Sequence, residues 1–111
     1  MKLPSEIRFA DEIVKKSFYD LKTGDKSDIE IYDFISQAFE NIGKNAFCGI
    51  QIPKRLIPKE YFVKYGTGNL WKYNLPNAWR LLYSIKGSKA IVISVILEWM
   101  DHKSYERKFN Y

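Results

Sequence analysis

Apolar and polar residues alternate along the last third of the chain, and this alternation predicts three consecutive β-strands. The strands are expected at 69–75, 79–86 and 90–99, where apolar or aromatic side chains recur at odd positions. Pro76-Asn77 separates the first two strands, and Gly87-Ser88 separates the last two. Because these turns are short, the neighbouring strands are expected to pair antiparallel.

The first half of the chain shows the spacing of helices. A short strand is expected at 7–10, and Asp11 then occupies the position that a helix N-cap prefers. Apolar residues follow Asp11 at helical spacing until residues 23–25 (Thr-Gly-Asp) interrupt the pattern. A second helix is expected from residue 27 or 28 to Gly43, with one apolar stripe along it. The short loop predicts an antiparallel helix pair.

These elements indicate an α+β fold with two N-terminal helices packed on one face of a twisted antiparallel β-sheet. A chain of 111 residues is expected to form a single domain, here 1–111. Between the helices and the strands, residues 46–68 contain Pro53 and Pro58, which disfavour a long helix. We expect an extended basic connection there, with a short helix at 59–64.

Strand parity predicts the two faces of this sheet, because successive side chains of a strand point to opposite faces. The odd positions are almost wholly apolar or aromatic, from Trp71 to Trp99, and this face is expected to meet the helices. The even positions are mixed, and this face is expected to be open to solvent. It carries Lys72, Arg80, Ser94 and Glu98. A single bulge would move part of a strand to the opposite face.

The net charge of +5 is concentrated in the second part of the chain. Residues 1–48 contain seven basic and nine acidic residues, whereas residues 49–111 contain eleven basic and four acidic ones. A basic surface attracts polyanions, and nucleic acid is the commonest polyanion in cells. The alternative is that these lysines serve solubility alone. The segregation of charge favours nucleic acid.

Several classes of protein are disfavoured by composition. The longest apolar run, at 90–97, is too short for a transmembrane helix, which needs about 20 residues. The N-terminus carries acidic residues where a signal peptide needs an apolar stretch. We therefore expect a cytoplasmic protein without membrane contact. With Cys48 as the only cysteine and His102 as the only histidine, a disulfide framework is excluded, a zinc site is disfavoured and no cofactor is expected.

The candidate chemistry combines the open face with the charged tail that follows the last strand. RNA is cleaved by its own 2′-hydroxyl when a base takes the proton, an acid protonates the leaving oxygen and cations stabilise the phosphoryl charge. Glu98 or His102 is the candidate base, and His102 or Tyr105 is the candidate acid. Arg80 and Lys72 are suited to hold the phosphate. The alternative for the tail is a surface pair between His102 and Asp101.

Further cations are candidates for binding RNA without taking part in the chemistry. They lie in the proline-marked connection and in the tail, where exact catalytic geometry is hard to maintain. These candidates are Lys54, Arg55, Lys103 and Arg107. The alternative is again a contribution to solubility alone.

The order of elements and two short motifs resemble the RelE/ParE superfamily of type II toxins. WRLLY at 79–83 resembles the aromatic-Arg-apolar-apolar-Tyr strand of that family, and DHKSYE at 101–106 is similar to the ending of its HigB-like branch. The sequence departs from the family at Asn74, where many relatives have a second arginine, and in its long connection at 46–68.

The resemblance implies a toxin that cleaves mRNA on the ribosome without a metal ion, with Arg80, Lys72, His102 and Tyr105 at the site. It also implies a cognate antitoxin as partner. The aromatic-rich chain is a candidate homodimer when that partner is absent. Two alternatives remain open, namely a ParE-like toxin that inhibits DNA gyrase and an inactive binding protein of the same fold.

Overall fold

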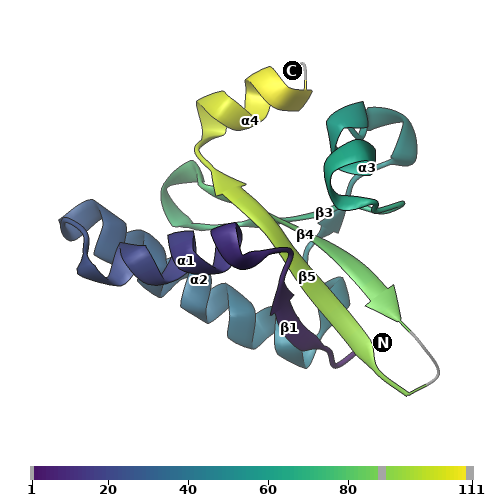
Figure 1. Cartoon of the computed structure of the whole chain (residues 1–111), viewed down its shortest axis with the longest axis horizontal. Coiled ribbons are helices and arrows are strands. Elements are labelled where there is room, and N and C mark those ends of the chain that lie inside the picture. The colour runs from purple at the N-terminus through teal and green to yellow at the C-terminus, as the bar shows by residue number, and fades with distance from the viewer. Residues whose placement is uncertain (1, 88–89, 110–111) are drawn as a thin grey trace.

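The computed structural model describes residues 2–87 and 90–109, which form four α-helices and one five-stranded mixed sheet. Figure 1 shows the elements, whose bounds follow in chain order. They are β1 (Glu6–Phe9), α1 (Glu12–Asp20), α2 (Lys26–Lys44), β2 (Ile50–Gln51), α3 (Lys59–Tyr65), β3 (Trp71–Asn74), β4 (Arg80–Gly87), β5 (Val92–Met100) and α4 (His102–Phe109). Short 3₁₀ segments lie at Leu21–Thr23, Ala46–Cys48, Lys54–Leu56 and Pro76–Ala78. The α+β class is thus confirmed.

The strands are ordered β1-β5-β4-β3-β2. β3, β4 and β5 pair antiparallel as their short turns predict, although the turn at Gly87-Ser88 lies partly outside the described residues. The prediction of a wholly antiparallel sheet was wrong, because β1 pairs parallel to β5. β1 and β5 are far apart in the sequence, so no tight turn forces them to run in opposite directions.

The N-terminal elements follow their sequence signals closely. The carboxylate of Asp11 accepts a hydrogen bond from the Val14 N–H at 2.8 Å and caps α1. Asp25 and Asp28 form a reciprocal capping box, so α2 begins one residue before the earlier of the predicted positions. α2 also continues past Gly43 to end at Lys44. Asn45 is its C-cap and accepts from the Leu3 N–H at 3.0 Å.

The connection at 46–68 contains the short helix expected there, α3, and also the edge strand β2. β3 begins at Trp71 and not at residue 69 as predicted, because Asn69 bonds to β4 through its side chain and not through backbone hydrogen bonds. Its Oδ1 accepts from the Ile85 N–H at 2.8 Å, and its Nδ2 donates to the Ile85 carbonyl at 2.9 Å. One amide side chain thus satisfies both backbone groups of a β4 residue.

A β-bulge in β5 changes the predicted faces of the sheet. Leu82 pairs with Glu98 and Tyr83 pairs with Ile96, which leaves Leu97 as the extra residue. Before the bulge the odd positions of β5 therefore point away from the α1–α2 side. Leu97 and Val95 were predicted on that side and lie on the other. Ser94 was predicted on the open face, but its Oγ lies 2.8 Å from the Ser5 Oγ on the opposite one.

The two faces carry separate hydrophobic clusters, as the adjacent pairs Leu81 and Leu82, and Ile96 and Leu97, demonstrate. The first cluster combines side chains of α1 and α2 with strand residues. Its buried members are Phe18, Ile31, Ile35, Ala38, Ile42, Leu75, Leu81, Tyr83 and Ile96.

The second cluster shows that the face expected to be open is covered over much of its area by α3, α4 and the connection. Its buried members are Ile52, Ile57, Tyr61, Leu70, Leu82, Leu97, Met100, Tyr105 and Phe109. The prediction of a solvent-open face was wrong, because flipping Leu97 and Val95 to this side creates apolar surface that must be buried. Beside the start of β4, polar side chains remain exposed among the described residues, and the 47% exposed His102 side chain is one of them.

Candidate active site

Arg80 is the first residue of β4 and follows a tight loop from β3. The Leu75 N–H donates to the Trp79 carbonyl at 2.9 Å and closes this loop. Within it, Asn77 and Ala78 have φ values of 59° and 62°, in the left-handed region that residues with a Cβ rarely adopt. The loop fixes the direction in which the Arg80 side chain leaves the sheet, next to the N-terminus of α4.

The Arg80 guanidinium faces His102, the first residue of α4. Its Nη2 lies 3.4 Å from His102 Nδ1, and its Nη1 donates to the Trp79 carbonyl at 3.2 Å. On the other side of the imidazole, His102 Nε2 contacts the carboxylate of Glu106 one helical turn later. An ionised carboxylate only accepts hydrogen bonds and a guanidinium only donates them. The arrangement therefore favours the tautomer that carries its proton on Nε2 and turns its Nδ1 lone pair toward Arg80.

Asp101 caps α4 and is not the partner of His102. Its Oδ1 accepts from the Ser104 N–H at 2.8 Å, and this hydrogen bond lowers the pKa of the Asp101 carboxyl. The alternative of a surface pair between His102 and its preceding neighbour is therefore not what the structure shows. The cap fixes where the helix begins and thus where the imidazole stands.

Lys72 and Tyr105 lie next to Arg80 and complete the group. The Lys72 ammonium is 5.1 Å from the centroid of the Tyr105 ring, and the Arg80 guanidinium carbon is 5.8 Å from it. Tyr105 is 1% exposed and belongs to the second cluster, whereas the His102 side chain is 47% exposed. The structure thus brings four predicted site residues together, but it presents the histidine to solvent and buries the tyrosine.

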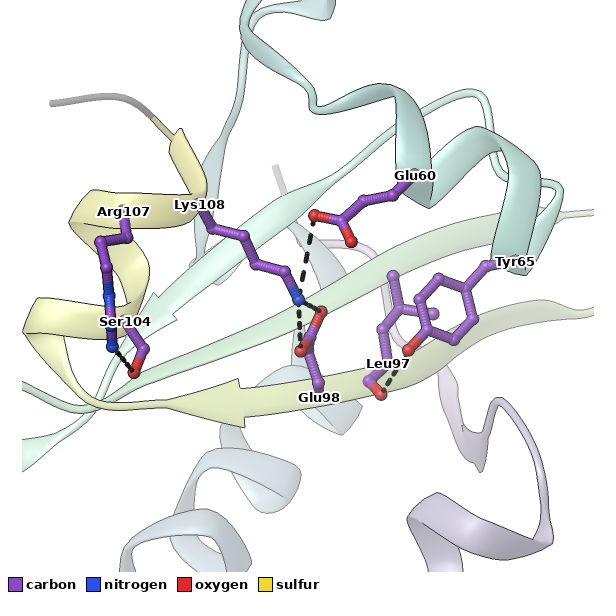
Figure 2. Close-up of polar contacts among 7 residues, drawn as sticks. All are labelled: Glu60, Tyr65, Leu97, Glu98, Ser104, Arg107 and Lys108. Carbon is purple, nitrogen blue, oxygen red and sulfur yellow. Dashed lines mark hydrogen bonds and ion pairs between the residues drawn. The ribbon is translucent and has the colours of Figure 1, made fainter.

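Glu98 lies apart from this group, in a cleft between α3 and α4 (Figure 2). Lys108 Nζ donates to both of its carboxylate oxygens, at 3.1 and 3.2 Å, and lies 4.0 Å from Glu60. Burial and the neighbouring Glu98 carboxylate raise the pKa of Tyr61. The cleft has a volume of about 630 Å³. Glu98 is therefore held in an ion pair that joins the two helices.

The remaining predicted RNA contacts are scattered around these features. Lys54 and Arg55 are exposed on a 3₁₀ segment of the connection, and Lys103 is exposed on the first turn of α4. Arg107 donates to the Ser104 Oγ at 3.4 Å and lines the cleft beside Glu98. Among the described residues, no hydrogen bond or ion pair joins any of the four side chains to His102.

Two residues that bind the predicted site residues, Glu106 and Lys108, were not predicted from the sequence. Glu106, the partner of His102, carried a usable signal, since residues four apart on a helix are neighbours. Lys108, the partner of Glu98, carried none, because their contact depends on how α4 folds back over β5. The expected helical turn at His102 and Tyr105 does form, yet only packing decides which of the two is buried.

Comparison of the chain with protein-family models, curated proteins and solved structures returns no match. Within residues 2–87 and 90–109, no group of three or more His, Cys, Asp or Glu side chains is placed to hold a metal ion. No helix in the described part of the chain is long and apolar enough to cross a bilayer.

Proposed function

We propose that this chain is a RelE-like toxin, with its two N-terminal helices on one face of the sheet, that cleaves mRNA on the ribosome without a metal ion. The observation that carries the proposal is the contact between Arg80 and His102, with Glu106 behind the imidazole. A cation, an acid–base group and a carboxylate that orients it are the parts that cleavage by the 2′-hydroxyl requires.

In this proposal His102 is the acid–base residue. Its Nδ1 lone pair is the basic site, and Glu106 stabilises the imidazolium that forms when the 2′ proton is taken up. The imidazolium then gives this proton to the 5′ oxygen as the P–O bond to it breaks and the 2′ oxygen bonds to phosphorus. The contact from Arg80 to this nitrogen is long, at 3.4 Å. A phosphodiester seated against Arg80 and Lys72 attracts the guanidinium and leaves Nδ1 to the 2′-hydroxyl. Glu98 has no part in this scheme, because its carboxylate faces Lys108 in the separate cleft.

The exposed cations of the connection and of α4 extend the same proposal to binding. Lys54, Arg55 and Lys103 would contact the RNA or ribosome backbone and contribute to affinity. Arg107, beside the cleft, would contribute in the same way. A cognate antitoxin is proposed as the partner that blocks the site in the cell.

The test is a ribosome-dependent translation reaction in which mRNA 5′ ends are mapped with and without the protein. Wild type is expected to create new 5′ ends, and His102→Ala to lower cleavage by roughly 10²-fold or more. Lys15→Ala is the control and should cleave like wild type, since this lysine is exposed on α1 and has no part in the proposed site or in the proposed RNA contacts. Glu106→Gln should give an intermediate loss.

Two outcomes would refute the proposal. Cleavage by His102→Ala at the wild-type rate removes the histidine from the chemistry. An intact message with wild-type protein, together with inhibition of DNA gyrase supercoiling, assigns the chain to the gyrase-directed class instead.

A further inference from the structure

Tyr105 occupies a position that does not suit the role of proton-donating acid, for which it was a candidate beside His102. Its side chain is 1% exposed, and its hydroxyl oxygen is buried. The ring stacks on Phe109 of the same helix, with centroids 4.4 Å apart and planes inclined by 21°. A substrate oxygen on the surface of the protein therefore has no direct path to the hydroxyl.

The opposite face of the same ring carries two cations. Phe109 covers one face, so Lys72 at 5.1 Å and Arg80 at 5.8 Å from the centroid both lie toward the other. An aromatic face attracts cations through its quadrupole. The ring thus holds the two side chains from different strands at one place.

Neither cation is neutralised by the rest of the described chain. Within residues 2–87 and 90–109, neither Lys72 nor Arg80 makes an ion pair with a carboxylate. The Arg80 Nε is buried without a hydrogen-bond partner among these residues. Two like charges held close together repel each other, and a bound anion relieves this repulsion.

We infer that Tyr105 is a positioning residue: its ring aligns Lys72 and Arg80 to receive a phosphate group of single-stranded RNA, and its hydroxyl transfers no proton. The cleavage part of this inference rests on the proposed function. The anion-binding part does not, because it follows from the ring and the two cations alone. Loss of the hydroxyl and loss of the ring should therefore have different consequences.

The first experiment measures binding of a fluorescent single-stranded oligonucleotide by anisotropy at fixed salt, with 2′-deoxy sugars so that no cleavage occurs. Tyr105→Phe keeps the ring and should bind within about twofold of wild type. Tyr105→Leu removes the ring face and should weaken binding roughly 10-fold. Phe109→Leu is the matched control, because it truncates the other ring of the stack, which faces neither cation, and should retain affinity. Urea unfolding of each variant confirms that it is folded in the assay.

Fluorination provides a second series in case Tyr105→Leu does not fold. Phenylalanine, trifluorophenylalanine and pentafluorophenylalanine at position 105 keep nearly the same shape while the negative charge of the ring face is withdrawn stepwise. Affinity should fall with each step. A flat series, or Tyr105→Leu binding like wild type, would overturn the inference.

The second experiment separates positioning from proton transfer through the pH profile of kcat/KM for ribosome-dependent cleavage. Tyr105→Phe should keep both the rate and the shape of the pH profile. Tyr105→Leu should lower the rate at every pH without shifting the profile along the pH axis. Loss of cleavage in Tyr105→Phe with binding intact would show that the hydroxyl is an acid and would refute the inference. If wild type binds but never cleaves, the proposed function fails, while the binding series still decides the role of the ring.

Discussion

Gly49 lies where two elements approach so closely that one added methyl group would meet both the Tyr83 side chain and the β3 backbone. It follows the 3₁₀ segment 46–48 and has φ −81°, which any residue can adopt, so only space is at issue. A Cβ at this position would lie 2.6 Å from the Tyr83 Oη and 2.7 Å from the Lys72 carbonyl oxygen. Tyr83 is fully buried, donates to the Ala46 carbonyl at 2.7 Å and accepts from the Gly49 N–H at 3.1 Å.

The cost of Gly49→Ala follows from these contacts. The Lys72 oxygen belongs to the backbone of β3 and cannot rotate away, so the methyl group must displace either β3 or the Tyr83 side chain. Overpacking of this kind costs about 1–3 kcal/mol. Displacing Tyr83 also weakens two hydrogen bonds worth about 1 kcal/mol each. We expect a loss of about 2–4 kcal/mol in the free energy of unfolding, and a melting temperature lower by roughly 10 °C.

Urea unfolding followed by tryptophan fluorescence measures this change. Gly68→Ala is the matched control, because a Cβ there meets nothing within 4 Å, and it should leave the stability unchanged or raise it slightly. Tyr83→Phe removes the nearest clashing atom, so the double variant with Gly49→Ala should be more stable than the sum of the two losses predicts, by about 1 kcal/mol. A Gly49→Ala protein within 0.5 kcal/mol of wild type would refute the close approach.

Three further predictions concern the loops and helix that frame the site. Ala78→Gly should raise the free energy of unfolding by about 0.5–1 kcal/mol, because φ 62° strains a residue that has a Cβ. Asn77→Gly should raise it less, since asparagine tolerates this region. An Ala78→Gly protein that is no more stable than wild type would contradict the strain. Lys108→Met should lower the unfolding free energy by about 1–2 kcal/mol, as its partly buried carboxylate partner is left alone, whereas Lys103→Met should change it by less than about 0.5 kcal/mol in the same urea assay. The pKa of Asp101 is lowered from its usual 3.8 in the folded protein, so its ionised carboxylate stabilises α4 above pH 3.8, and this stabilisation is lost as pH falls through the folded pKa. Amide hydrogen exchange should show α4 opening more readily at acid pH in wild type, and Asp101→Asn should not show this change.

The N-terminal half of the fold was predictable because its signals are local. Asp11 marks the start of α1, and helical apolar spacing with an acidic first turn marks α2. The observed ends of α2 and β3 differ from the predicted ones by one or two residues where a side chain makes hydrogen bonds in place of the backbone. Asn45 ends α2 in place of Gly43, and the amide of Asn69 replaces the first rungs of β3.

The site was predictable only in part. Lys72, Arg80 and His102 share one surface as expected, because strand parity places Lys72 and Arg80 on one face and the tail continues from the neighbouring strand. Glu98 lies on that face as well, but no local rule shows that Lys108 folds back to bind it. Tyr105 follows His102 by one helical turn, and the sequence gives no sign that one is exposed while the other is buried.

The sequence by itself determined the α+β class, the antiparallel meander of β3, β4 and β5, and the concentration of basic residues in the second half of the chain, which also holds the single histidine. These features were predictable because periodicity and turn residues act locally and composition needs no structure. Only the tertiary structure decided which residues face which cluster. The bulge at Leu97 reverses the faces of the first part of β5, and no residue in that strand signals it. The reversal arises because register is set by pairing with β4 and by the apolar surface that α3 and α4 must cover, and both involve residues distant in the chain.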